Sequence, residues 1–309
     1  MSAVPLRALL RGGGVARLWR DPRYASLAVT VSLFVAMSVA GGVLYDGFLR
    51  PQVFLNLLID NSFLLIVAVG MTFVILTGGI DLSVGAVIAF STVLLASLVQ
   101  HHGWHPLPAI GAVLVLGTGF GALMGVLIER YRLQPFVVTL AGMFLARGAA
   151  TLVSVDSIGI DHAFHVAVAS LRIPLGGRTS ISAGALIALL VVAVGALLAA
   201  KTRFGRTVYA IGGNVQSAHL MGLPVERTLV QVYALSGFCS ALAGVVYTFY
   251  MLSGYSLHAT GLELDAIAAV VIGGTLLAGG SGYVLGTVFG VLVLGLIQTL
   301  IAFDGTLSS

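Results

Sequence analysis

Runs of about twenty apolar residues recur along this chain of 309 residues, and they constrain its fold more than any other feature. A helix of that length is what a bilayer requires of a membrane-spanning segment. Only 8% of the residues are charged, whereas soluble proteins have roughly a quarter. The pattern predicts an all-α, polytopic bundle of membrane helices rather than a soluble domain.

We expect about nine spans or partial spans, which fill most of 24–309. They cover about 25–44, 60–77, a stretch ending near 99, 109–128, 136–154, 183–200, 229–251, 265–278 and 283–303. Arginine and lysine gather before the first span, after the fourth and after the sixth, and cytoplasmic loops are rich in both. The basic N-terminus 1–23 is therefore predicted to be cytoplasmic. By this count the chain ends outside, which suggests that a last span is missing and that about ten are expected with it.

A polar segment, 201–228, lies between the sixth and seventh spans and holds the only lysine, Lys201. A polar loop between spans cannot lie in hydrocarbon, and its basic excess predicts the cytoplasmic side. Within it, 216–222 (QSAHLMG) is predicted to form a short helix, because the Gly212 and Gly213 pair precedes it and Gly222 ends it. A short surface helix between spans suits docking to a soluble partner.

Two stripes carry glycine at every fourth residue, a spacing that lets helix backbones approach closely. The stripes are Gly117, Gly121 and Gly125, and Gly282, Gly286 and Gly290. Two interpretations are open: tight packing inside one subunit, or contact between two subunits.

Two glycine pairs, Gly78 with Gly79 and Gly279 with Gly280, interrupt apolar runs, and the residues around them match at an offset of 201 residues. Both pairs stand where a predicted span reaches the cytoplasmic side, so the repeat would be parallel. Broken helices at corresponding places indicate a substrate pathway in transporters. Chance similarity between glycine-rich apolar runs is the alternative.

Asp81 follows the first break within apolar surroundings, where an acid is costly unless it faces water, a partner or the bundle interior. One interpretation is that Asp81 or Ser83 caps the next helix. The other is that Asp81 and the nearby Gly85 belong to a gate or pathway. Glu263 and Asp265, which precede a later apolar run, raise the same question.

Arg147 lies within the fifth predicted span. If it is buried, it needs a counter-charge or a group of carbonyl oxygens. Alternatively, its long side chain reaches the membrane surface.

No constellation for catalysis or nucleotide binding is recognisable. The segment 195–202 (GALLAAKT) has P-loop spacing, but Ala200 replaces the second glycine and no strand precedes it. His101, His102 and His105 have no carboxylate or cysteine nearby, which favours a surface loop over a metal site. We therefore predict a chain that is not an enzyme and binds no metal or cofactor, so that any ATP must bind to a separate subunit.

Three long motifs are VGMTFVILTGGIDLSVGAV (69–87), TRFGRTVYAIGGN (202–214) and ELDAIAAVVIGGTLLAGG (263–280). They resemble the permease subunits of bacterial ABC importers for simple sugars, the ribose-type group, and the similarity runs from about 56 to 309. LAGMFLARG (140–148) and the ending FDGTLSS resemble one permease of the galactofuranose importer most closely.

The resemblance implies that 24–309 is a permease domain in the bacterial inner membrane. It implies three kinds of partner: a second permease, the same or a related chain; cytoplasmic ATPase subunits, which bind ATP and Mg²⁺; and a periplasmic sugar-binding protein. No nucleic acid is implied. The loop 201–228 then couples the permease to the ATPase.

ABC importers mark the coupling loop with the pattern E-A-A-x-x-x-G. Here Gln216 replaces the glutamate and Ser217 the first alanine, so shape rather than charge would carry the contact. The candidate coupling residues are Gly213, Asn214, Gln216, Ser217, Ala218, Met221 and Gly222.

The implied mechanism is alternating access, in which the ATPases move the coupling loop and the spans repack. The flexible breaks would be Gly78, Gly79, Gly279 and Gly280. Neither Trp19 nor Trp104 lies in a span to stack on a sugar, so the binding protein is expected to set most of the specificity. The first alternative is an ion- or proton-coupled secondary transporter that uses Asp81 and Asp265. A membrane enzyme or scaffold is the second.

Overall fold

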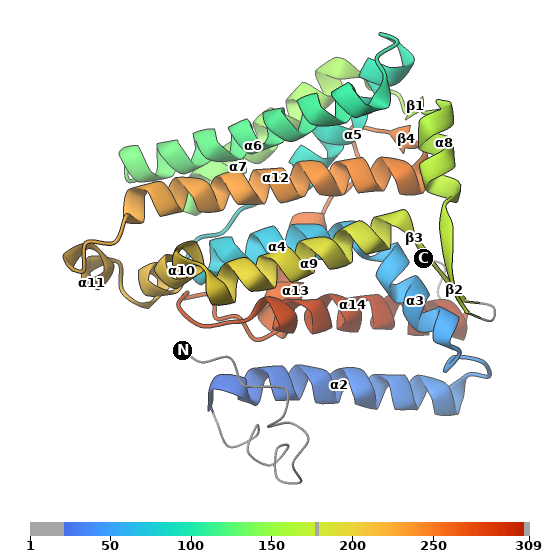
Figure 1. Ribbon diagram of the computed structural model, residues 1–309, viewed down its shortest axis with the longest axis horizontal. Coiled ribbons are helices and arrows are strands. Elements are labelled where there is room, and N and C mark those ends of the chain that lie inside the picture. The colour runs from blue at the N-terminus through green and yellow to red at the C-terminus, as the bar shows by residue number, and fades with distance from the viewer. Residues whose placement is uncertain (1–21, 177–178, 306–309) are drawn as a thin grey trace.

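The computed structural model describes residues 22–176 and 179–305, and it confirms the all-α membrane bundle (Figure 1). Within those ranges, six helices are long and apolar enough to cross a membrane. They are α2 (Pro22–Leu44), α6 (Pro106–Arg130), α7 (Pro135–Val153), α9 (Ala183–Lys201), α12 (Val225–Met251) and α14 (Val284–Asp304). Most of the basic N-terminus, 1–21, and the last residues of the FDGTLSS ending, 306–309, lie outside the described residues.

A bent pair of helices forms a further candidate span. α3 (Pro51–Asp60) and α4 (Ser62–Leu76) meet at Asn61 with a bend of 60°. The predicted spans leave 45–59 between the first two spans, and Pro51 starts a helix within this stretch. Proline suits the first helical position, where its fixed φ is already helical and its missing N–H is not needed.

Two apolar helices are shorter than a span. α5 (Val84–Gln100) has 17 residues and α13 (Leu262–Ile272) has 11. The predicted span 265–278 is therefore wrong at its end, because the helix stops at Ile272 and Gly274 adopts a left-handed φ of +90°. The nine predicted spans correspond to six long helices, one bent pair and two short helices in the described part of the chain.

The remaining elements are short and lie at the two ends of the bundle (Figure 1). One end, here the α8 end, has α8 and two antiparallel strand pairs, β1 with β4 and β2 with β3. The other end, here the α11 end, has α10 and α11. Their bounds are α8 (Ala163–Ser170), α10 (Arg203–Gly213), α11 (Val215–Leu220), β1 (Ile158–Gly159), β2 (Arg172–Gly176), β3 (Thr179–Ser182) and β4 (Ser253–Gly254).

Helix α4 is the centre of the core. All of its residues except Phe63 are buried, as expected of a helix that is hydrophobic on every side. α12 packs on α4, α5 and α6, while α9, α13 and α14 also contact α4. The breaks that follow α4 and α13 are thus supported by long helices.

Both glycine stripes pack inside the chain. A Cβ on Gly121 of α6 would overlap the carbonyl oxygen of Tyr233 on α12, and Gly117 lies against Ala241 of the same helix. In the second stripe, Gly286 and Gly290 of α14 meet the backbone of α13. Of the two interpretations, the structure therefore supports close helix packing within one subunit for these residues.

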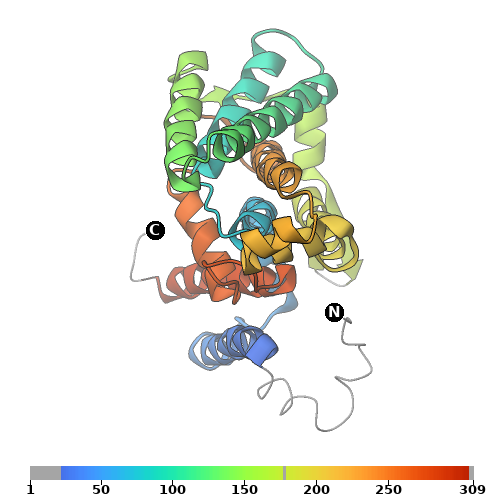
Figure 2. The same ribbon diagram turned by 90° about the vertical axis from the view of Figure 1, so that its left-hand side faces the viewer.

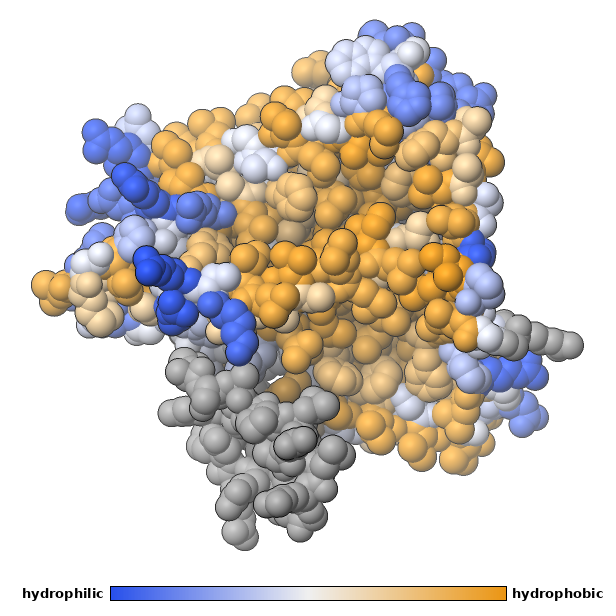
Figure 3. Space-filling model, viewed as in Figure 1, coloured by the Kyte–Doolittle hydropathy of each residue, from blue (hydrophilic) through white to orange (hydrophobic). Residues whose placement is uncertain are grey.

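The surface shows a broad hydrophobic band between two hydrophilic ends (Figure 3). Large apolar side chains are exposed along α2, α7 and α9, including Val43, Leu152 and Leu190. Exposed apolar side chains on parallel helices are costly in water and are the normal surface of a membrane protein.

Candidate functional site

The four glycines predicted as flexible breaks lie together at the α11 end. The amide of Gly280 donates a hydrogen bond of 2.9 Å to the carbonyl oxygen of Leu76, the last residue of α4. Gly78 and Gly279 both have a left-handed φ, +80° and +87°, which favours glycine. The two breaks, 201 positions apart in the sequence, are therefore joined backbone to backbone.

Asp81 lies in the first break and is fully buried. One carboxylate oxygen accepts hydrogen bonds from the amide and hydroxyl of Ser83, at 2.9 and 2.6 Å. The other accepts from the hydroxyl of Ser236 on α12, at 2.7 Å. Asp81 therefore holds the turn that leads into α5 and ties this turn to α12. Ser83 is the N-cap residue of α5, but no side chain among the described residues caps the amides of its first turn, so the capping interpretation is not confirmed.

Gly85 and Glu263 meet where α5 and α13 begin. A Cβ on Gly85 would overlap a carboxylate oxygen of Glu263 and would lie 2.6 Å from the carbonyl oxygen of Ala259. That carboxylate oxygen is buried and has no hydrogen-bond partner among the described residues. Glu263 and Asp265 lie in the first turn of α13 rather than before the helix. The helix dipole favours an acid in the first turn. Asp265 is exposed and is separate from this group.

Arg147 of α7 holds the segment that leads into α13. One guanidinium nitrogen donates to the carbonyl oxygens of Ser256 and His258, at 2.7 and 2.8 Å. The charge of Glu263 also acts on Arg147. Of the two interpretations, the structure supports the group of carbonyl oxygens.

Helix α11 projects from the bundle at the α11 end (Figure 1). Leu220 is 90% exposed and Met221 is 65% exposed, so that two large apolar side chains lie at a polar end of the molecule. Ala218 is instead fully buried against Ile211 and Val225. The other coupling candidates are exposed: Gly213, Asn214, Gln216, Ser217 and Gly222.

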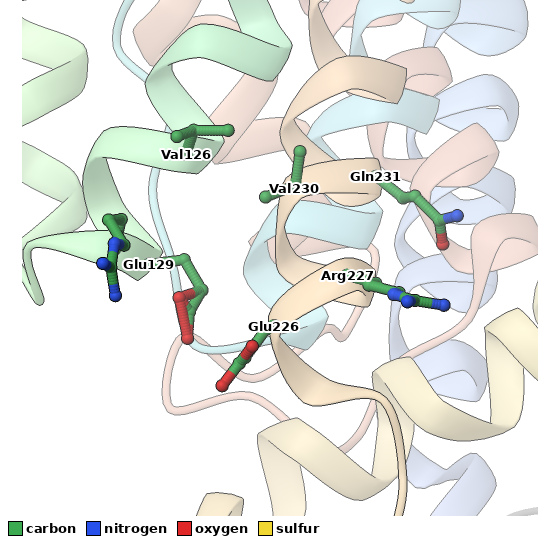
Figure 4. Close-up of a pocket in the computed structure, with 7 residues that line it drawn as sticks. Val126, Glu129, Glu226, Arg227, Val230 and Gln231 are labelled. Atoms are coloured by element: carbon green, nitrogen blue, oxygen red, sulfur yellow. The ribbon is translucent and has the colours of Figure 1, made fainter.

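A groove between the ends of α6 and α12 opens beside α11. Figure 4 shows Glu129 of α6 and Glu226 of α12 at its mouth, with Val126 and Val230 deeper between the helices. Arg130 and Arg227 line the same groove, which therefore offers charges of both signs around an apolar floor. Charge at this position was not predicted as part of a site, because the two acids are far apart in sequence.

The remaining sequence candidates do not form a site. No group of three or more histidine, cysteine or acidic residues within 22–176 and 179–305 could hold a metal ion. His102 contacts the carbonyl oxygen of Ser97, and His105 caps α6 by accepting from the amide of Leu107. The P-loop-like segment lies inside α9.

A hydrophobic bundle with two joined breaks at one end and a projecting helix beside them is the architecture of a membrane transport subunit. The family model described as branched-chain amino acid transport system / permease component matches residues 53–306, and the chain belongs to this permease family.

The curated relatives include three bacterial permeases. The inner membrane ABC transporter permease protein YjfF of Escherichia coli (strain K12) is 53% identical, over 93% of this chain and 87% of that protein. The fructose import permease protein FruG of Bifidobacterium longum (strain NCC 2705) is 44% identical, over 91% and 84%. The ribose import permease protein RbsC of Bacillus subtilis (strain 168) is 39% identical, over 90% and 85%. No solved structure matches the chain. The resemblance to ribose-type ABC permeases is confirmed.

The sequence did not reveal two functional features of the loop 201–228. The first is α10, which fills 203–213 although this stretch contains three glycines. Its apolar residues recur on one helical face, and this periodicity was the available signal. The second is the exposure of Leu220, which only the orientation of α11 determines.

Proposed function

We propose that the chain is the membrane permease of an ATP-driven importer for a simple sugar, a pentose or hexose. The observation that carries this proposal is the exposed apolar tip of α11, Leu220 and Met221, at the end of the bundle where both breaks meet. Apolar side chains in an aqueous loop are explained by a partner that covers them. Relatives whose names include fructose and ribose import support the substrate class.

The partner on α11 is an ATPase subunit, which binds ATP and Mg²⁺. Gln216 and Ser217 replace charged or smaller residues of the usual coupling pattern, so the fit depends on the apolar tip. A groove with charges of both signs lies beside it, lined by Glu129, Arg130, Glu226 and Arg227, and suits charged groups of the same partner. The α11 end, with the basic N-terminus, is then cytoplasmic.

A second permease, the same or a related chain, and a periplasmic sugar-binding protein complete the importer. The binding protein docks at the α8 end and sets most of the specificity, with galactofuranose among the candidate sugars. Asp81, Gly85, Glu263 and Asp265 line or gate the pathway. The contact of Gly85 with Glu263, where α5 and α13 begin, supports this assignment.

The first experiment is capture of the partner ATPase by this chain in detergent. Leu220→Asp with Met221→Asp places two charges on the apolar tip and is expected to abolish capture. Trp104→Asp is the control and should leave capture unchanged, because Trp104 is exposed and precedes His105, which contacts Phe164 of α8 at the α8 end. Ala218→Arg is unsuitable, since Ala218 is buried and its replacement would disrupt the loop itself.

Capture that survives the two charges would move the docking site away from α11. If the native chain captures no ATPase, a secondary transporter becomes the better explanation. In that case sugar uptake would collapse with the proton gradient and persist without ATP. Asp81, with three donors on its carboxylate, already gives that alternative little support.

A further inference from the structure

Three glycine pairs, far apart in the sequence, meet at one point of the α11 end. Two are the breaks Gly78 with Gly79 and Gly279 with Gly280, and the third is Gly212 with Gly213 at the end of α10. In the view onto this end, α10 and α11 lie in front of α4 (Figure 2). We call this meeting point of 76–79, 212–213 and 278–280 the glycine junction.

Gly212 fills the centre of the glycine junction. A Cβ on Gly212 would overlap both the carbonyl oxygen of Leu76 and the amide nitrogen of Gly280, which are the two partners of the hydrogen bond between the breaks. A Cβ on Gly279 would lie 3.1 Å from the Cα of Gly212. The backbone of α10 thus touches both breaks at once, and no larger residue fits at position 212.

A hydrogen bond reinforces this contact. The phenol of Tyr209, one turn earlier on α10, donates to the carbonyl oxygen of Gly282 at 2.8 Å. Burial raises the pKa of Tyr209 to about 12, so the phenol keeps its proton and remains a donor at neutral pH. α10 therefore binds the second break at two points.

The same end of α10 leads directly into α11. The side-chain oxygen of Asn214 accepts from the amide of Ser217 at 2.7 Å and so caps α11 directly after α10 ends. Ala218 of α11 is buried against Ile211 of α10. The two helices share an apolar contact and a cap, so they are expected to move as one body.

We propose that α10 is a lever that transmits movement of α11 to both breaks simultaneously, with Gly212 as its point of contact. This inference rests on the proposed function, because it requires a partner that moves α11. A backbone-to-backbone contact suits this role, since it contains no side chain whose rotamer change could absorb the displacement. One movement then acts on the ends of α4 and α13 together, as alternating access requires.

The chain contains a matched pair of variants for the test. Gly212→Ala inserts a methyl group into the glycine junction, whereas Gly119→Ala, also within a helix but outside the junction and the coupling loop, meets nothing within 4 Å. Tyr209→Phe keeps the ring and removes only the hydrogen bond to Gly282. The complete importer, with its ATPase, second permease and binding protein, is reconstituted in proteoliposomes. ATP hydrolysis and uptake of radiolabelled D-ribose, D-fructose and D-galactose are measured together.

In Gly212→Ala we expect capture of the ATPase and ATP hydrolysis to persist, while sugar uptake per ATP falls by at least about fivefold, the lower end of typical coupling factors. Tyr209→Phe should show a smaller loss of the same ratio, and Gly119→Ala none. A purely structural role would lower protein yield and thermal stability without changing uptake per ATP.

If Gly212→Ala takes up as much sugar per ATP as the native chain, the proposal that α10 acts as a lever is wrong. If Gly212→Ala does not assemble, Tyr209→Phe tests the proposal instead. An unchanged sugar uptake per ATP in Tyr209→Phe would then show that the proposal is wrong. Failure of the proposed function is a different result: the native importer itself would then show no ATP-dependent uptake of any sugar tested.

Discussion

Ser236 on α12 donates a hydrogen bond of 2.7 Å to Asp81, 155 positions earlier in the break between α4 and α5. α12 begins directly after the loop that carries α11. The bond therefore connects the first break to α12, in addition to the contact that α10 makes with the same break. The break is thus held from two sides, by α10 at the glycine junction and by α12 at Asp81.

The first prediction concerns this carboxylate. Asp81→Ala leaves the amide of Ser83 and the hydroxyl of Ser236 without their acceptor, at a cost of about 1–3 kcal/mol for each buried group that finds no other partner. Asp81→Asn keeps an acceptor and should lose much less. Thermal unfolding of the purified chain in detergent measures both. Equal losses of stability in the two variants would show that the hydrogen-bond acceptor at position 81 does not stabilise the fold. Asp265→Ala, which changes an exposed side chain, is the control.

The second prediction concerns close packing of α6 on α12. Gly121→Ala places a methyl group against the carbonyl oxygen of Tyr233 and should destabilise the chain by about 1–3 kcal/mol, as overpacking does. Gly119→Ala, two residues earlier on α6, meets nothing within 4 Å and should be neutral or stabilising by up to about 1 kcal/mol. Midpoints of thermal unfolding compare the two directly. The packing interpretation fails if both glycines tolerate alanine equally.

The third prediction concerns Arg147 and Glu263. Arg147→Met removes the donor from the carbonyl oxygens of Ser256 and His258, and it leaves Glu263 without the cation that acts on it. Glu263→Gln removes the acid. In a double-mutant cycle we expect the two losses of stability to be less than additive by about 0.5–3 kcal/mol, because the residues share one network. Additive losses would separate Glu263 from this network.

The fourth prediction concerns pH and the α8 end. His165 of α8 is fully buried beside Phe249, with ring centroids 5.1 Å apart. Burial, aided by the charge of His162, lowers the pKa of His165 from 6.5 to about 4. The folded chain therefore keeps this ring neutral between those values, while the unfolded chain binds a proton. Stability should fall as the pH falls through this window, by up to about 1.4 kcal/mol per pH unit, and level off below it.

The control for the pH prediction is His165→Phe, which keeps an aromatic ring and removes the titration. Its unfolding midpoint should vary less between about pH 7 and pH 5 than that of the native chain. An identical pH dependence in both chains would assign the effect to another group. His102→Phe, on an exposed histidine, should behave like the native chain.

Local sequence patterns were sufficient for most elements and for the class of protein. Apolar runs of span length predicted the long helices to within a few residues, because the bilayer sets how many residues a helix needs. The pairs at Gly78 and Gly279 marked the breaks, since glycine adopts without strain the left-handed φ that both residues have. The helix at Pro51 and the early stop at Ile272 were missed, because the apolar runs alone do not locate these ends.

By itself, the sequence determined the membrane bundle, the two breaks, the polar loop 201–228 and the permease family. Only the tertiary structure decided that Gly212 joins the two breaks, that Ser236 holds Asp81 and that Ala218 faces inward while Leu220 faces out. Composition and periodicity act within one element, whereas these contacts depend on the crossing and rotation of helices distant in sequence. Those are set by how the backbones pack together.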